Sequence, residues 1–372
     1  MSLRQTTLNI SLERLRANYR ALAKHGGANL CPVIKANAYG HGLIEVAQAL
    51  TLENPAYLAV ALCEEGVLLR EAGIQSPILV LGPAPTDSYG YIIDHQLVPC
   101  ISNTTQIEML ANAAQGKSLN YHLKVDTGMS RLGVALEDLS SALEKLASFP
   151  NLNMQGVLTH FANADLGDMA YSQKQIERFQ QALQEITKSE FKPEIIHCSN
   201  SAATLDLNIP EQTMLRPGLA LYGINPLGPQ KPPIDIQPAT LWRTSPLHIK
   251  TIPAHTPVSY GGTWQSGQET TLAVLPVGYA DGYRREFSNR AEVLIDGARA
   301  PVIGKVCMDH TLVDVTHLPT TSLESEVVLM GKQGQDELSP WQLAQWAETI
   351  PYEILCGISA RVKRTYDESL SP

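Results

Sequence analysis

Short apolar runs alternate with amphipathic segments between about residues 30 and 225. A repeat of this kind is typical of βα units around a parallel sheet. Helices are predicted over Glu64–Ala72, Gln173–Ile186 and Asn103–Ala114, the last with an Asn103/Gln106 capping pair. The predicted strands are Cys31–Lys35, Tyr57–Ala61, Ile78–Gly82, Val98–Ile101, Tyr121–Val125, Met154–Leu158, Glu194–Cys198 and Thr213–Arg216. Eight such units predict an α/β fold with a TIM (β/α)8 barrel. A doubly wound open sheet is the alternative, and no Gly-x-Gly-x-x-Gly after the first strand supports it.

The pattern changes after Asn225. The proline-rich segment Pro226–Pro233 can continue neither a helix nor a central strand, so it predicts a linker. The expected domains are therefore 1–230, a barrel, and 231–372, a smaller, mainly β domain with which the first ten or so residues could pair. One helix is predicted there, because Ser339-Pro340-Trp341-Gln342 carries helix-start signals. The predicted strands are Leu247–Ile252, Thr271–Val277, Ala291–Ile295, Pro301–Val306, Thr311–Val315 and Val327–Leu329.

Composition narrows the classes of protein. The net charge is −9, and acidic and basic residues are interspersed, which argues against nucleic acid or an anionic membrane as a partner. The first residues lack the apolar core of a signal peptide, and no apolar run approaches membrane-spanning length, so a cytoplasmic location is expected. The six cysteines are far apart, and neither they nor the histidines show metal-ligand spacing, so reduced thiols and no metal site are expected.

Polar residues cluster where the predicted strands end. In a TIM barrel the reactive residues lie at these ends, commonly with a phosphate site after strands seven and eight. Lys35 ends the first strand, and burial would lower its pKa and make its amine nucleophilic toward a carbonyl cofactor such as pyridoxal 5'-phosphate. The others are Lys124, Asp126 and Arg131 after strand five, His160 after strand six, Ser199-Asn200-Ser201 after strand seven and Arg216-Pro217-Gly218-Leu219 after strand eight.

The segment Lys35-Ala36-Asn37-Ala38-Tyr39-Gly40-His41-Gly42 resembles the cofactor signature of alanine racemases. Further segments match that family in order over nearly the whole chain: Asp126-Thr127-Gly128-Met129, His160, Asn200-Ser201, Arg216–Gly218, Ser259-Tyr260-Gly261, Gly278-Tyr279-Ala280-Asp281-Gly282 and Cys307-Met308-Asp309. The resemblance implies a homodimer that uses pyridoxal 5'-phosphate to interconvert L- and D-alanine, supplying D-alanine for peptidoglycan.

The resemblance also implies roles for the cofactor-binding residues. Lys35 would bind the cofactor covalently, and Arg216 would bond its pyridine nitrogen. Arg131 would lie near the phenolic oxygen and the substrate carboxylate, and His160 would lie beside the cofactor. The implied phosphate ligands are Tyr39, Ser201, the backbone of Gly218 and Leu219, and Tyr352.

Inversion at an α-carbon is most simply done by two acid–base groups on opposite faces. In the family these correspond to Lys35 and Tyr260, and Tyr260 would come from the second subunit, as would the Met308 amide that binds the substrate carboxylate. Tyr279 resembles an entrance residue. Lys124 matches a lysine that is often carbamylated, and an unmodified Lys124 paired with Asp126 is the alternative.

Three other functions remain as alternatives. A racemase of broader amino-acid range would differ in the volume of its substrate pocket. A barrel decarboxylase would be expected to carry a carboxylate where Arg216 stands. A non-catalytic pyridoxal-phosphate carrier would have no use for Tyr260 or the β domain.

Overall fold

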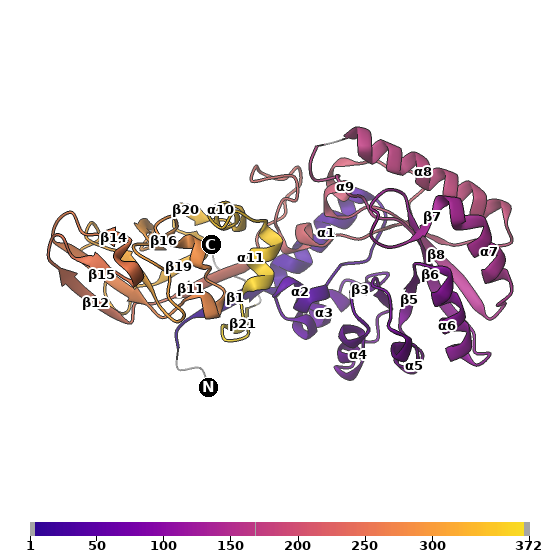
Figure 1. Ribbon diagram of the computed structural model, residues 1–372, viewed down its shortest axis with the longest axis horizontal. Coiled ribbons are helices and arrows are strands. Elements are labelled where there is room, and N and C mark those ends of the chain that lie inside the picture. Colours follow the sequence, from indigo (N-terminus) through magenta and orange to yellow (C-terminus); the bar gives the residue numbers. More distant parts are fainter. Residues whose placement is uncertain (1–3, 168, 368–372) are drawn as a thin grey trace. The chain divides into compact units, whose positions relative to one another are not determined.

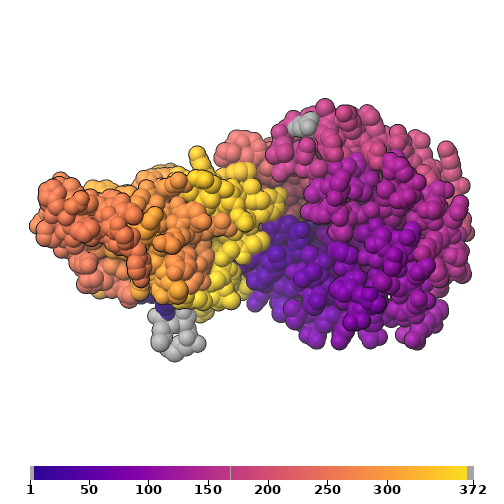
Figure 2. All heavy atoms as spheres, viewed as in Figure 1, coloured from indigo at the N-terminus to yellow at the C-terminus, as the bar shows by residue number. Residues whose placement is uncertain are grey.

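The computed structural model describes residues 4–167 and 169–367. Contacts divide the described chain into two units: a barrel unit of Leu15–Ala38 and Leu43–Gln237, and a second unit of residues 4–14, 39–42 and 238–367. The space-filling view shows the barrel unit mostly in indigo to magenta and the second unit mostly in orange and yellow (Figure 2). Among the described residues, no helix is both long enough and apolar enough to cross a membrane.

The barrel unit contains a ring of parallel strands. Its continuous part runs in the order β3-β4-β5-β6-β8-β9. The ring is closed by the pairing of β10 with β2, by a hydrogen bond of 2.8 Å from the Thr213 N–H to the Ile196 carbonyl, and by a parallel bridge between Val33 and Ala59. The TIM barrel is therefore confirmed. The strands are β2 (Asn29–Leu30), β3 (Leu58–Val60), β4 (Ile78–Val80), β5 (Val98–Ile101), β6 (Leu119–Asp126), β8 (Leu152–Leu158), β9 (Ile195–His197) and β10 (Met214–Leu215), with β7 (Val134–Ala135) paired to β6.

Helices cover the outer side of these strands (Figure 1). They are α1 (Leu12–Gly26), α3 (Leu43–Thr51), α4 (Cys63–Glu71), α5 (Tyr89–Asp94), α6 (Thr104–Ala114), α7 (Leu139–Ala147), α8 (Met169–Lys188) and α9 (Ser201–Asp206). Their apolar residues recur at helical spacing and are buried, as in α7, where Leu139, Leu143 and Leu146 face inward. The predicted cap of α6 is confirmed, because the Asn103 side chain accepts the Gln106 N–H at 2.9 Å.

The first predicted strand, Cys31–Lys35, is wrong: it shares no residue with β2, and within it only Val33 forms a bridge. Strand β2 stops at Leu30, and Lys35 begins α2 (Lys35–Tyr39), a left-handed turn in which Ala36, Asn37, Ala38 and Tyr39 have φ between 52° and 55°. Left-handed backbone costs a non-glycine residue roughly 1–2 kcal/mol. The Ala38 N–H donates to the Ile34 carbonyl at 2.8 Å and the Ala36 N–H donates to Glu65 at 2.6 Å, so the turn is held in place directly after Lys35.

Among the described residues, the second unit contains two larger sheets, mostly antiparallel, and a two-stranded antiparallel sheet of β13 and β14. The larger runs β17-β16-β19-β11-β1-β21 with β20 beside β19, and its N-terminal strand β1 pairs antiparallel with β11 and parallel with β21. The other of the two larger sheets runs β12-β15-β18. The strands are β1 (Thr7–Ser11), β11 (Thr240–Thr244), β12 (His248–Ile252), β13 (Pro257–Val258), β14 (Trp264–Gln265), β15 (Thr270–Leu275), β16 (Glu292–Ile295), β17 (Ala298–Pro301), β18 (Thr311–Asp314), β19 (Val327–Gln333), β20 (Asp336–Leu338) and β21 (Lys363–Asp367).

Two predictions for this unit are corrected. The segment Pro301–Val306 is not a strand, because β17 ends at Pro301 and Val302 makes only an isolated bridge. The described residues of this unit form two α-helices rather than one: α10 (Pro340–Trp346) begins after the predicted cap Ser339, and α11 (Pro351–Gly357) follows. The N-cap residue Ile350 makes no side-chain capping bond, so the local signals were weaker than for α10: Pro351 at the start and Glu353 in the first turn.

Candidate functional site

Arg216 lies at the centre of the barrel unit's polar site. It follows β10 and is 2 % exposed. Its Nη1 donates to the His197 carbonyl at 2.7 Å and to His197 Nδ1 at 2.9 Å, and its Nη2 donates to the Thr159 carbonyl at 2.6 Å and the Cys198 carbonyl at 3.2 Å. Among the described residues, no acceptor bonds its Nε–H. Hydrogen bonds from Nη1 and Nη2 thus fix the guanidinium, and its Nε–H can donate to a ligand.

Two buried histidines, His197 and His122, form a chain of hydrogen bonds with Arg216. Because Arg216 donates to His197 Nδ1, the His197 proton is assigned to Nε2, which donates to His122 Nδ1 at 2.8 Å. Burial lowers the pKa of His122 to about 3, with a further contribution from Arg216, and burial likewise holds the pKa of His197 well below its usual range. Both rings are therefore neutral, and this pair forms a fixed relay of hydrogen bonds that ends at Arg216.

Four cationic side chains influence His160, which follows β8. Burial is the main reason that the pKa of His160 lies well below its usual value, and Arg216, Lys124, Arg131 and Lys35 lower it further. Lys124 itself is 7 % exposed, and burial lowers its pKa to about 8. This gathering of positive charge is suited to an anionic ligand such as a phosphate ester or a carboxylate.

Asp126 organises the loop that carries Arg131. Its Oδ1 accepts the N–H groups of Gly128 at 2.9 Å and Ser130 at 3.1 Å, and Tyr171 donates to the Gly128 carbonyl at 2.7 Å. Within the described part of the chain, the Asp126 carboxylate is held by these amides, and no ion pair joins it to Lys124. The charge of Asp126 nevertheless raises the Lys124 pKa against the larger effect of burial, so the pairing of an unmodified Lys124 with Asp126 stays a prediction beside carbamylation.

Ser201 and Gly218 meet where β9 and β10 end. The Ser201 hydroxyl oxygen accepts the Gly218 N–H at 2.8 Å and the Ala220 N–H at 3.2 Å. Its own O–H has no acceptor among the described residues and can donate to a ligand. Leu219 begins the following 3-10 turn, so the predicted phosphate residues Ser201, Gly218 and Leu219 are adjacent.

In the second unit, Tyr39 and Tyr352 lie together. Their ring centroids are 5.9 Å apart and their planes are tilted by 43°. Burial raises the pKa of Tyr39, so its phenol stays protonated and can donate. Gly40 is packed closely against α11, since a Cβ there would lie 2.4 Å from the Leu355 carbonyl oxygen.

Three predicted residues are exposed on neighbouring loops of the second unit: Tyr260 is 70 % exposed, Met308 53 % and Tyr279 43 %. The Tyr279 N–H donates to the Cys307 carbonyl at 3.0 Å, which joins the loops of Tyr279 and Met308. Ser259, next to Tyr260, donates to the Lys305 carbonyl at 2.7 Å. The loops of these three residues are therefore held by hydrogen bonds to the backbone, while the side chains of Tyr260, Met308 and Tyr279 are exposed.

Sequence reasoning missed the two histidines behind Arg216. His122 lies two residues before Lys124 on β6, so strand alternation places both on one face. His197 ends β9 among apolar residues. In both cases a polar residue within an otherwise apolar strand was the signal in the sequence that could have indicated a buried hydrogen-bonded group.

Comparisons with known proteins agree over both units. The family model described as "Alanine racemase, N-terminal domain" matches residues 10–226, and that described as "Alanine racemase, C-terminal domain" matches residues 239–366. Curated alanine racemases from Halothermothrix orenii and Carboxydothermus hydrogenoformans are each 40 % identical, covering 99 % and 98 % of this chain and 98 % and 100 % of their own lengths.

Solved structures give the same result. Alanine racemase from Bacillus anthracis, solved with bound L-Ala-P, has a TM-score of 0.91 and 32 % identity, covering 99 % of this chain and 96 % of its own. Alanine racemase from Bartonella henselae, solved with covalently bound pyridoxal phosphate, has a TM-score of 0.89 and 28 % identity, covering 98 % of this chain and 99 % of its own.

Proposed function

Because this chain belongs to the alanine racemase family, and is thus a pyridoxal-phosphate-dependent isomerase of L- and D-alanine, we propose that Lys35 and Tyr260 are its two acid–base groups. Pyridoxal phosphate, when bound, supplies an electron sink that acidifies the α-proton of alanine. Lys35 would move that proton on the face of the D-isomer and Tyr260 on the face of the L-isomer. Tyr260 belongs to the second unit and would act in the site of the partner subunit.

Arg216 suits the pyridine nitrogen of the cofactor. Its free Nε–H can donate, and a guanidinium cannot accept, so the ring nitrogen would carry no proton of its own. A ring held in this way withdraws electrons less strongly than one paired with a carboxylate. This favours rapid return of a proton to the α-carbon and disfavours transamination.

Five residues are proposed as donors for the cofactor phosphate. Ser201 can donate its hydroxyl proton, the backbone of Gly218 and Leu219 lies beside it, and Tyr39 and Tyr352 would add two phenols. Such a set matches the several donors that a phosphate dianion requires.

The substrate carboxylate would be bound by Arg131 and by the Met308 amide of the partner subunit. Lys124 is proposed as the carbamylated neighbour that positions Arg131. Its buried amine has a pKa lowered to about 8 by desolvation, which leaves a larger neutral fraction to react with carbon dioxide than an exposed lysine has.

The exposure of Tyr260 together with Met308 and Tyr279 carries the proposal of a homodimer with composite sites. We place residues 1–230 in the cofactor-binding domain, except that the first ten or so pair with the second unit through β1, and 231–372 in the domain that completes the partner's site. The wider role proposed for the enzyme is to supply D-alanine for peptidoglycan from a cytoplasmic location.

Subunit mixing tests this proposal. A Lys35→Ala chain mixed with a Tyr260→Phe chain forms dimers with one intact site, and random mixing should restore about a quarter of wild-type activity. Mixing the Tyr260→Phe chain with a Lys35→Ala/Tyr260→Phe chain is the matched control and should restore none. Absence of activity in the first mixture, with mixed dimers demonstrated by native mass spectrometry, would contradict composite sites.

A further inference from the structure

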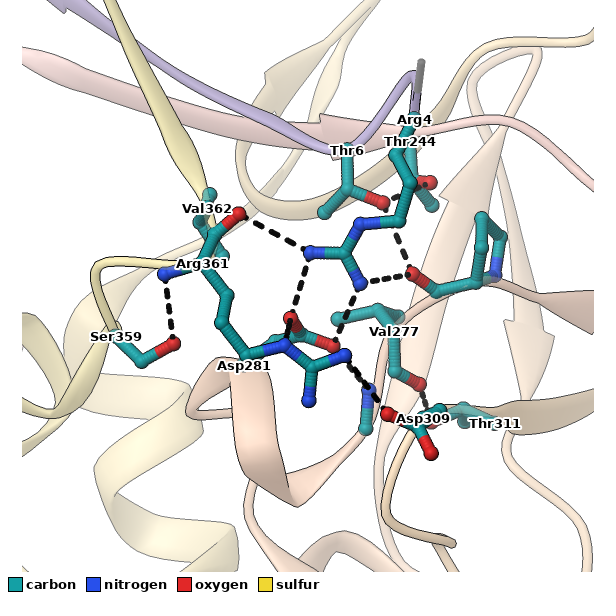
Figure 3. A network of polar contacts seen from close by, with 12 residues as sticks. Arg4, Thr6, Thr244, Val277, Asp281, Asp309, Thr311, Ser359, Arg361 and Val362 are labelled. Atoms are coloured by element: carbon teal, nitrogen blue, oxygen red, sulfur yellow. Dashed lines mark hydrogen bonds and ion pairs between the residues drawn. The ribbon is translucent and has the colours of Figure 1, made fainter. Parts of the chain in front are cut away.

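Asp281 is a fully buried carboxylate at which two guanidiniums meet (Figure 3). Arg4 Nη2 donates to Asp281 Oδ1 at 2.7 Å, and Arg4 Nη1 donates to Oδ2 at 3.3 Å. Arg361 Nε lies 3.5 Å from Oδ1, and the Gly278 N–H donates to Oδ2 at 3.1 Å. The carboxylate thereby joins the N-terminal segment to the 278–282 turn and to the residues before β21.

The N-terminal segment is anchored beyond this ion pair. Arg4 also donates to the carbonyls of Pro276 at 3.5 Å and Arg361 at 3.2 Å. The Thr6 hydroxyl donates to the Pro276 carbonyl at 3.1 Å and lies 2.8 Å from the Thr244 hydroxyl (Figure 3). Arg4 is therefore presented to Asp281 from a fixed backbone, and its side chain is only 31 % exposed.

The same turn supports the loop of Met308. A Cβ at Gly278 would lie 2.2 Å from the Cys307 carbonyl oxygen and 2.4 Å from that of Met308, so the two backbones are in direct contact. The Ala280 N–H donates to the Met308 carbonyl at 3.1 Å. On the other side of Met308, Asp309 accepts from Arg361 Nη2 at 2.8 Å.

We propose that Arg4, acting through Asp281, is a positioning residue that holds the Met308 and Tyr279 loops in place for the substrate bound by the partner subunit. A buried ion pair contributes little to net stability on average, because desolvation offsets the attraction. In this unit the Arg4–Asp281 pair would instead fix the position of the Tyr279 loop against the Met308 loop. The inference rests on the proposed role of Met308 as a carboxylate ligand.

Arg4→Gln removes the guanidinium but leaves Asp281 its contacts with Gly278 and Arg361. Because the Met308 amide would bind the carboxylate equally in ground and transition states, its displacement should raise KM for alanine about tenfold and change kcat less than about threefold. Arg4→Lys should recover part of the loss. Arg243→Gln is the matched control, since it breaks a half-exposed ion pair with Glu326 (2.6 Å) in the same unit, and it should leave KM unchanged.

Subunit mixing separates positioning from folding. In the mixture of Lys35→Ala and Tyr260→Phe chains, the intact site takes its Met308 loop from the Lys35→Ala chain. Arg4→Gln placed on that chain should raise KM, whereas on the Tyr260→Phe chain it should not. An equal effect from both placements, or a lower thermal midpoint with unchanged KM, would overturn the inference. Failure of the mixture before Arg4 is altered would instead count against the composite site.

Discussion

Replacing Gly156 by alanine should destabilise the barrel through the histidine relay. Gly156 lies in β8 opposite His122, and an added Cβ would lie 2.6 Å from the Nδ1 atom, 2.7 Å from Cε1 and 2.8 Å from Cγ of that ring. The ring has little freedom to move. It is fully buried, its Nδ1 is bonded to His197 at 2.8 Å, and it packs edge-on against Tyr57 with centroids 5.2 Å apart.

The magnitude follows from these contacts. Overpacking a filled core costs about 1–3 kcal/mol, and loss of the His122–His197 hydrogen bond adds about 1 kcal/mol. A total of about 3 kcal/mol corresponds to a fall in thermal midpoint of roughly 6–12 °C for a domain of this size. Activity should also fall, because the relay no longer fixes Arg216.

Differential scanning fluorimetry of the cofactor-loaded protein measures the effect. Gly90→Ala is the matched control: Gly90 is exposed in α5, and beyond its chain neighbours and its own helix backbone nothing lies within 4 Å of the added Cβ, so helix propensity should stabilise the protein by about 0.5–1 kcal/mol. A midpoint for Gly156→Ala within about 1 °C of wild type would refute the account of the relay.

Three further predictions concern the relay and the loops. The pKa of His122 is about 3 in the folded protein against an ordinary 6.5, so between these pH values the unfolded chain binds more protons than the folded chain. The contribution of His122 to the free energy of unfolding is therefore fully present above pH 6.5 and is about 2 kcal/mol smaller at pH 5. His122→Gln should flatten the decline of the thermal midpoint between pH 7 and 5, and an unchanged slope would contradict this. Arg216→Glu should lower racemisation more than about a hundredfold while the share of pyruvate formed by transamination rises, because a carboxylate partner keeps the ring nitrogen protonated. A pyruvate share equal to that of the wild type would count against the role of Arg216. Gly278→Ala should raise KM for alanine, because its Cβ would overlap the Cys307 and Met308 carbonyls, and an unaltered KM in steady-state assays would be inconsistent with the contact.

The barrel was predictable because its strands are short apolar runs between amphipathic helices. Val98–Ile101 agrees residue for residue with β5, since its burial is nearly continuous. The end of the first strand was not predictable from pattern. Residues Ala36–Tyr39 have no glycine to signal a left-handed turn, which depends on contacts such as the one from Ala36 to Glu65.

The site was predictable in part for a similar reason. Arg131 and Arg216 come after β6 and β10, so the position of the strand ends indicated them, whereas Lys35 comes after the isolated bridge at Val33. The Arg4–Asp281 pair was missed because its members are 277 positions apart and only the folded second unit brings them together. Short-range sequence patterns do not predict an ion pair between residues so far apart.

The two-base mechanism is tested most directly by chiral chromatography of the products formed from L-alanine in deuterated water. The cofactor-loaded enzyme and Tyr260→Phe are compared in parallel. L-serine, L-lysine and L-arginine are run beside L-alanine. We expect α-deuterated D-alanine to form much faster than the other D-isomers and to be largely lost in Tyr260→Phe. Full activity of Tyr260→Phe would contradict the two-base mechanism, and comparable turnover of the larger amino acids would show a broader substrate range.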